Sequence, residues 1–169
     1  MCSSDLVMLV SAVWRGQTAT KAWLKSLHQS NYDWDVCQFA LQELAQGWKE
    51  DPETLPWLKD LASAERGDMR QIALIVLARG WRRDPEILRL LKSRAHSDDS
   101  WTVRKSALLE VARGWRDHPE TLAWLKDKAQ SDQHKFVRRT AVHEVARGWK
   151  DDPETLAWLR SEEHTSELQ

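Results

Sequence analysis

The sequence predicts an all-α fold, an α-solenoid of helix pairs that repeat about every 33–34 residues, and three observations predict it. A glycine-tryptophan step recurs, each copy is followed by Asp-Pro-Glu or a close variant, and no segment alternates as a β-strand does. The recurring pairs, whose glycines are 33, 34 and 34 residues apart, are Gly47 with Trp48, Gly80 with Trp81, Gly114 with Trp115, and Gly148 with Trp149. A fixed period of this length is typical of a repeat array, in which each unit buries surface mainly against its neighbours.

The second helix of each unit leads into the glycine. In the unit over residues 98–126, one helical face collects the apolar residues, which are Val103, Ala107, Leu108, Val111 and Ala112. We expect Gly114 to end this helix in the left-handed conformation, with Trp115 folding back onto the last turn in a Schellman motif. The four glycines and four tryptophans are therefore predicted to be structural.

The first helix of the next unit begins at Asp-Pro-Glu. Aspartate is a good N-cap, proline suits the first helical position, and glutamate favours the positive end of the helix dipole. Three units keep the motif, at Asp51–Glu53, Asp84–Glu86 and Asp152–Glu154, whereas His118-Pro119-Glu120 departs from it and predicts a weaker cap. The apolar stripe of the first helix consists of Leu122, Leu125 and Ala129, with Trp124 beside it.

An acidic turn precedes Val-Arg-x-x-Ala in two units, at Val103–Ala107 and Val137–Ala141, and a shortened version precedes Ala73. This pattern resembles the HEAT repeat, in which a turn aspartate and a second-helix arginine bridge neighbouring units. The resemblance implies a ladder of Arg70, Arg104 and Arg138, with Cys37 where another arginine is expected. The tryptophan-rich repeats are also similar to arrays attached to bacterial NACHT-type NTPases, which implies a non-catalytic interaction scaffold or sensor arm.

We expect the array to span residues 7–159, as helix pairs flanked by half units at 7–14 and 153–159. The pairs are predicted at about 17–46, 52–79, 85–113 and 119–147. Residues 1–6 and 160–169 resemble translated sequencing adapters, so we expect a fragment of a longer protein with non-native ends. Uncapped repeats at both ends predict a monomer or weak self-association.

Composition excludes several function classes. The chain has net charge −1, and residues 7–159 carry 24 basic and 22 acidic side chains, so no strong global attraction to nucleic acid or membrane is expected. No apolar run approaches the roughly 18 residues that span a bilayer. Cys37 is the lone cysteine of that segment, which favours a reducing, cytoplasmic location. No phosphate-binding loop, metal-ligand spacing or acid–base pair occurs, so we expect no enzyme, cofactor or metal.

A partner-binding surface is predicted where the repeats differ from one another. Columns spaced i, i+4 and i+8 on the second helices vary between units and share one edge, which we expect to face a concave groove. Its predicted binding residues are Arg79, Lys105, Leu109, Arg113, Arg139, His143 and Arg147. The edge changes from amide-rich near residues 38–46 to basic near 139–147, which favours a protein partner with an acidic surface. Alternatively, Arg79, Arg113 and Arg147 only cap helices and cover apolar surface.

Two other functions remain open. Nucleic acid could bind the basic C-terminal half of the groove, a hypothesis that predicts strong salt dependence. Bilin lyases share HEAT-like repeats, although no residue here argues for that enzyme class specifically. Trp34 and Trp101, which lack counterparts in the other units, are compatible with either packing or binding.

Overall fold

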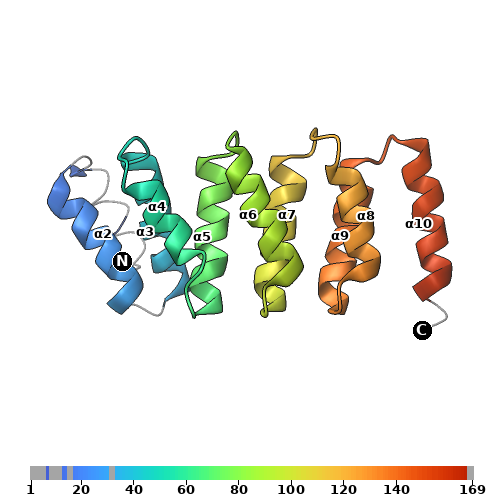
Figure 1. Cartoon of the computed structure of the whole chain (residues 1–169), viewed down its shortest axis with the longest axis horizontal. Helices are drawn as coiled ribbons and strands as arrows, with labels where there is room; N and C mark the ends of the chain where they lie inside the picture. The colour runs from blue at the N-terminus through green and yellow to red at the C-terminus, as the bar shows by residue number, and fades with distance from the viewer. Residues whose placement is uncertain (1–6, 8–12, 15–16, 31–32, 167–169) are drawn as a thin grey trace. The chain divides into compact units, whose positions relative to one another are not determined.

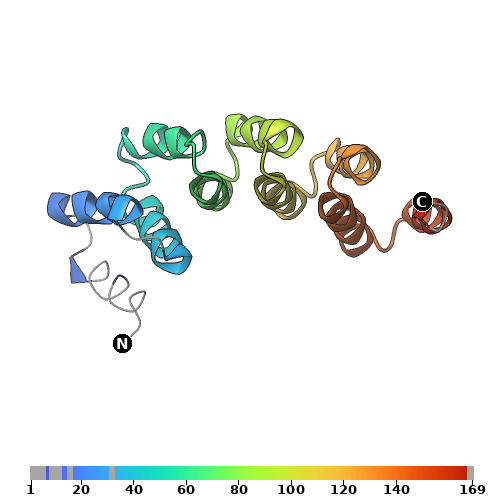
Figure 2. The same cartoon turned by 90° about the horizontal axis from the view of Figure 1, so that it is seen from below.

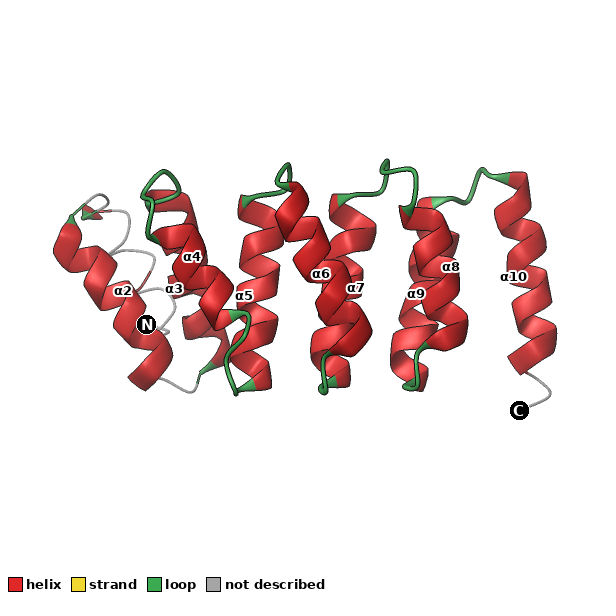
Figure 3. Cartoon of the chain, viewed as in Figure 1, coloured by secondary structure: helices red, strands yellow, loops and turns green. Residues whose placement is uncertain are grey.

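The computed structural model describes residues 7, 13, 14, 17–30 and 33–166. Throughout these residues the regular structure is helical and no strand occurs, which confirms the predicted all-α class (Figure 3). Most of the half unit predicted at 7–14, and all of segment 1–6, lie outside the described residues. The chain forms two compact units, residues 1–87 and 88–169.

The described residues of the first unit form two helix pairs. They are α2 (Thr18–Ser30) with α3 (Trp34–Gly47) and α4 (Thr54–Leu61) with α5 (Gly67–Gly80), followed by the start of α6 (Pro85–Ser97). α3 packs against both α2 and α5, and α5 packs against α4. Figure 2 shows α2 and α4 on one side of this unit and α3 and α5 on the other. Leu24, Leu44, Leu58 and Ile72 are fully buried between them.

The second unit contains the rest of α6, followed by four further helices. These are α7 (Trp101–Gly114), α8 (Thr121–Ser131), α9 (Lys135–Gly148) and α10 (Pro153–Ser166). α9 packs against α7, α8 and α10 (Figure 1). The apolar face predicted for α7 is buried, as is Leu125 of α8. Successive helix pairs thus stack within each unit, which is the predicted α-solenoid arrangement.

The recurring glycines do not end their helices in the predicted way. Each is the last residue of its helix, and the tryptophan that follows is the cap, with its N–H donating to the carbonyl four residues earlier. Neither Gly80 nor Gly148 has a positive φ. The expected left-handed glycine and Schellman motif are therefore wrong there, because the α-helical hydrogen-bond ladder simply continues to the tryptophan N–H.

The link from each second helix to the next first helix is a pair of tight turns. The backbone N–H of Asp51, Asp84, His118 and Asp152 donates to the preceding tryptophan carbonyl at 3.0–3.2 Å. Each of the three aspartates also accepts a hydrogen bond from the N–H of the glutamate two residues on, at 2.8–3.1 Å. His118 instead leaves its buried Nδ1 without a partner among the described residues. The exception at His118 therefore lacks the side-chain bond that the other units share.

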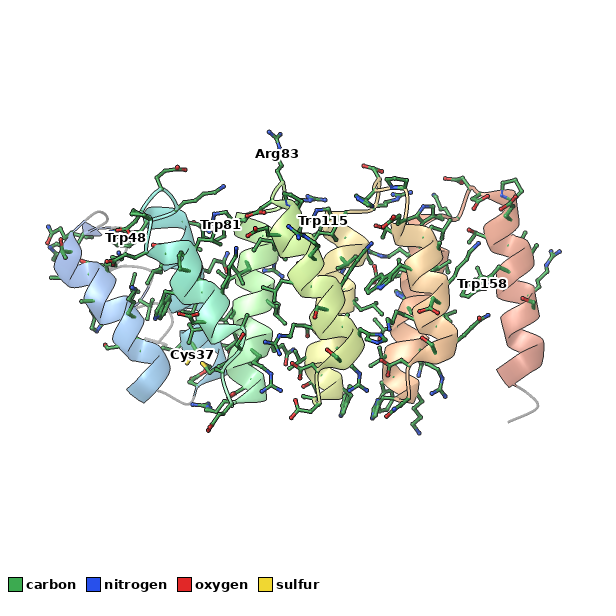
Figure 4. All side chains as sticks on the ribbon, in the orientation of Figure 1. Cys37, Trp48, Trp81, Arg83, Trp115 and Trp158 are labelled. Atoms are coloured by element: carbon green, nitrogen blue, oxygen red, sulfur yellow. The ribbon has the colours of Figure 1, made fainter. Side chains whose placement is uncertain are left out.

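Cations from one repeat cover tryptophan rings of the next. Lys49 lies 5.9 Å from the centre of the Trp81 ring, and Arg116 lies 5.7 Å from that of Trp149. Lysines of the first helices do the same: Lys25 with Trp57, Lys92 with Trp124, and Lys126 with Trp158, which points from α10 toward the preceding repeat (Figure 4). These contacts give the periodic tryptophans a packing role through ring area and cation–π attraction.

Candidate functional site

The candidate site is the varying edge of the second helices, which we call the second-helix edge. None of its residues is fully buried. In the first unit it consists of Gln38, Gln42 and Gln46 on α3 and Gln71, Ile75 and Arg79 on α5. In the second unit it consists of Lys105, Leu109 and Arg113 on α7 and Arg139, His143 and Arg147 on α9. The apolar face of these helices forms the core, whereas the edge is accessible.

In the second unit a buried carboxylate lies between two arginines of the edge. Arg147 Nη2 donates to Glu144 Oε2 at 2.6 Å, and Arg113 Nη2 donates to Glu144 Oε1 at 3.4 Å. The Glu144 side chain is 3% exposed, whereas those of Arg113 and Arg147 are 51% and 54% exposed. Sequence reasoning missed Glu144, although its position three residues before Arg147 is a common spacing for helical ion pairs.

In the first unit the edge lines a cavity of about 340 Å³ between α3 and α5. Four edge residues, Gln42, Gln46, Ile75 and Arg79, are joined there by Lys49 and by three small or apolar residues, Ala45, Val76 and Gly80. No carboxylate is among the lining residues. Lys49 was not predicted to belong to the edge, because it follows the helix end rather than lying on the helical column.

None of the arginines of the predicted ladder lines this cavity. Arg104 Nε and Nη2 donate to Asp132 Oδ2 and Oδ1 at 3.0 and 3.1 Å, which joins two repeats of the second unit. Arg70 Nη1 donates to the carbonyls of Ala64 and Glu65, and Arg138 Nη1 to those of Asp132 and Gln133. Burial opposes ionisation of Asp132, but hydrogen bonds from Arg104 and the His134 N–H outweigh it and hold the pKa of Asp132 below its usual value.

A polar cavity of about 410 Å³ lies beside this ion pair. Lys128, which is 4% exposed, lines it and places Nζ 2.8 Å from His96 Nδ1. Asp98 and Asp132 are also buried and line the same space. Both cations and carboxylates line this cavity, so its lining does not favour one sign of charge. Sequence reasoning missed Lys128, since a lysine on a first helix is ordinarily exposed.

Aromatic residues gather where α9 begins. The Trp101 and His134 rings stack with centroids 4.4 Å apart, and Phe136, which is 44% exposed, lies 5.5 Å from Trp101. Trp34, the other tryptophan without counterparts, donates from Nε1 to Gln38 Oε1 at 2.9 Å. Trp101 thus lies four residues before Lys105, and Trp34 lies four residues before Gln38. Each tryptophan therefore adjoins the first residue of the second-helix edge on its helix.

The described residues offer few other chemical groups. Burial raises the pKa of the Cys37 thiol, whose Sγ lies 3.9 Å from the carbonyl of Leu27. Among the described side chains, no three His, Cys, Asp or Glu residues come together as metal ligands. No described helix is both long and apolar enough to cross a membrane.

Comparison with known proteins supports the repeat assignment. The chain matches the family of HEAT repeats over residues 20–112, which is more than half of its length. No curated protein and no solved structure matches it.

Proposed function

We propose, since this chain belongs to the HEAT repeat family, that it is a non-catalytic protein-interaction scaffold or sensor arm. HEAT repeats are generally protein-interaction scaffolds, because stacked helix pairs present an extended surface made of many similar elements. In this proposal the partner binds the second-helix edge, which the HEAT resemblance assigns to the concave side.

One observation carries the proposal: the second-helix edge is accessible and varies between repeats, whereas the apolar columns of the same helices are buried and remain apolar. On α7, Lys105 and Leu109 are half-buried and Arg113 is exposed, whereas Val103, Ala107 and Val111 are fully buried. The buried columns repeat in α9, but the edge columns change from Leu109 to His143 and from Lys105 to Arg139. Freedom from packing is what a binding surface needs.

The chemistry of the edge favours an acidic partner. Lys105, Arg139 and the exposed guanidinium groups of Arg113 and Arg147 all lie in the second unit. The buried Glu144 carboxylate neutralises part of this charge. Its two ion pairs also hold the guanidinium groups of Arg113 and Arg147 in place, where a carboxylate of the partner could bind them. Leu109 adds an apolar contact between charged neighbours.

A charge-reversal experiment tests the edge. The double variant Lys105→Glu with Arg139→Glu reverses two charges of the edge. The matched control, Arg83→Glu with Lys150→Glu, reverses two exposed cations that do not belong to the edge. Figure 4 shows Arg83 pointing away from the ribbon. Proteins enriched by the immobilised wild-type chain should also be enriched by the control, but not by the edge variant. If both double variants enrich the same proteins as wild type, binding does not use the second-unit part of this edge.

A second candidate, nucleic-acid binding, is favoured by the aromatic cluster of Trp101, His134 and Phe136. Lys135 Nζ lies 5.5 Å from the Phe136 ring, so cations adjoin rings on which bases could stack. Glu144 counts against this candidate, because it places a carboxylate among the arginines that would contact phosphates. Titration with a single-stranded oligonucleotide at several salt concentrations decides it, since phosphate contacts require a steep loss of affinity with salt.

A further inference from the structure

We propose that the aromatic cluster of Trp101, His134 and Phe136 is the anchor of the interaction, and that it binds a large apolar side chain of the partner with carboxylates on both sides of it. This inference rests on the proposed interaction function and names the chemistry of the partner segment. The cluster lies within the second unit, where α7 and α9 begin, and adjoins the second-helix edge.

The three rings form one apolar surface that is partly open to solvent. Trp101 and His134 stack with 6° between their planes, and the Phe136 ring centre lies 5.5 Å from that of Trp101 and 5.6 Å from that of His134. Phe136 is exposed, and the other two residues are half-buried. An exposed aromatic ring that is supported by two others is a suitable anchor, because aromatic residues contribute much of the binding energy of protein interfaces.

The other repeats show that the fold does not need aromatic rings at these positions. His134 is the N-cap of α9, and the N-caps of the other second helices are Asp33, Arg66 and Ser100. Phe136 lies in a column that carries Asp35, Asp68 and Thr102 in those helices. Since polar residues serve this turn in three repeats, the rings of α9 are available for binding.

Cations flank the rings on both helices. Lys105 follows Trp101 by four residues on α7, and Arg139 follows Phe136 by three residues on α9. These spacings place side chains next to each other on one face of a helix. Lys135 Nζ lies 5.5 Å from the centre of the Phe136 ring. The apolar surface is therefore bordered by positive charge contributed by α7 and by α9.

This positive charge is available to a partner. No described carboxylate forms an ion pair with Lys105, Lys135 or Arg139. At the other end of the edge, by contrast, the Glu144 carboxylate pairs with two arginines. Lys135 also lies in the first turn of α9, where the helix dipole disfavours a cation, so its charge does not serve the helix itself. A carboxylate of the partner therefore complements the start of the edge.

A peptide fits the cluster better than a single-stranded nucleic acid does, although both can use rings and cations. His134 already covers one face of the Trp101 ring, and Lys135 lies over the Phe136 ring, which leaves less ring surface for stacked bases. Glu144 places a carboxylate on the same helix, where it repels phosphates. We therefore assign the cluster to a peptide segment with one large apolar residue between acidic residues.

The first experiment locates the bound peptide through the two phenylalanines of the chain. These are Phe39 in the first unit and Phe136, so a chain labelled with fluorophenylalanine gives two fluorine NMR signals, which Phe136→Leu assigns. Peptides selected from a random display library on the immobilised chain are synthesised and titrated. We expect them to carry a large apolar residue flanked by Asp or Glu, and to shift the Phe136 signal alone. Replacing their acids by amides should weaken binding about tenfold.

Matched variants then test the anchor. Phe136→Thr introduces the residue type that α7 carries in the same column, so it should fold as wild type does and weaken the selected peptides about tenfold. Leu156→Thr is the control, because Leu156 is 52% exposed and lies on α10, outside the cluster. The control should bind as wild type does, and circular dichroism should show equal helix content in both variants.

Three results would overturn the anchor. If the selected peptides lose affinity for Lys105→Glu with Arg139→Glu, but ignore Phe136→Thr and do not move the Phe136 signal, the anchor is rejected while the proposed interaction function stands. If the library yields no peptide that responds to either change, both are rejected. If a single-stranded oligonucleotide, and no peptide, shifts the Phe136 signal, the cluster recognises nucleic acid and the peptide proposal fails.

Discussion

Arg104 and Asp132 form a two-bonded ion pair between adjacent repeats, with Nε to Oδ2 at 3.0 Å and Nη2 to Oδ1 at 3.1 Å. The Asp132 side chain is 3% exposed and that of Arg104 is 13% exposed. Such a planar, bidentate geometry is available to arginine and not to lysine. The pair therefore fixes the relative position of α7 and the turn before α9.

The first prediction concerns this pair. Arg104→Met should destabilise the fold by about 3 kcal/mol, because it leaves the Asp132 carboxylate buried without its cation. Arg138→Met is the control in the same column; Arg138 donates only to carbonyls in the described structure, so its loss should cost about 1 kcal/mol. Urea unfolding measures both variants. Arg104 Nη1 also donates to the carbonyls of Asp98 and Asp99. Equal losses in the two variants would therefore show that the ion pair adds nothing to these carbonyl bonds.

A second prediction follows from the lowered pKa of Asp132. A carboxyl group with a lowered folded pKa stabilises the fold fully above its unfolded value of about 3.9, and this stabilisation is lost as the pH falls through the folded value. Between about pH 5 and 2 the wild type should therefore lose stability more steeply than Asp132→Asn. Urea midpoints across this range measure both slopes, and parallel slopes would contradict the assignment.

The third prediction is that His118→Asp stabilises the chain by about 1 kcal/mol. The substitution removes a buried Nδ1 that lacks a partner and restores the acceptor that Asp51, Asp84 and Asp152 each provide to a backbone N–H. Asp84→His is the reverse exchange in the neighbouring repeat and should destabilise. Thermal unfolding by circular dichroism measures both, and shifts in the same direction would refute the capping argument.

A fourth prediction uses the buried threonine column at the start of the first helices. Thr54 is fully buried and its hydroxyl has no partner among the described residues, whereas the Thr121 hydroxyl donates to the Trp115 carbonyl at 2.7 Å. Thr54→Val should stabilise by up to about 1 kcal/mol, and Thr121→Val should destabilise by a similar amount. Ile87 already fills this column in another repeat. Chemical denaturation of the two variants should give opposite signs.

The fifth prediction concerns the recurring glycines. Because Gly80 is helical without a positive φ, and an added Cβ would meet Ala45 Cβ at 4.0 Å, Gly80→Ala should stabilise by about 0.5–1 kcal/mol. Gly148→Ala should behave alike, since the nearest atom is Arg116 Nε at 3.8 Å. A left-handed glycine would give the opposite sign, so the melting temperatures of the two variants distinguish the geometries.

Periodicity predicted what each repeat does within itself. The spacing of Val103, Ala107 and Val111 identified a buried face because a helix converts sequence spacing directly into position around its axis. The fold class and the family followed in the same way.

The predicted helix start at Asp-Pro-Glu holds for α6 and α10, which begin at Pro85 and Pro153. It is wrong for α4, which begins at Thr54 with Glu53 as its N-cap, because Asp51 to Thr54 first form a separate turn. Local sequence did not distinguish a glycine that ends a helix by a left-handed turn from one that stays helical, because glycine is suited to both.

Contacts between repeats were the part that sequence reasoning missed. Lys49 stands 32 residues before Trp81 and Arg116 stands 33 before Trp149, so the signal was present as a basic residue one repeat upstream. This basic residue can be paired with its tryptophan only when the position of one repeat against the next is known. The same holds for Glu144 beside Arg113 and for Lys128 beside His96, which pair across repeats.

The contacts between cations and tryptophans also give the array a direction. In each described pair the cation belongs to the earlier repeat and the ring to the later one. These repeats therefore present a cation to the repeat that follows and an aromatic ring to the repeat that precedes. A gene that gains or loses one whole repeat keeps this complementarity at the new junction, so evolution can adjust the length of the array without redesigning its interfaces.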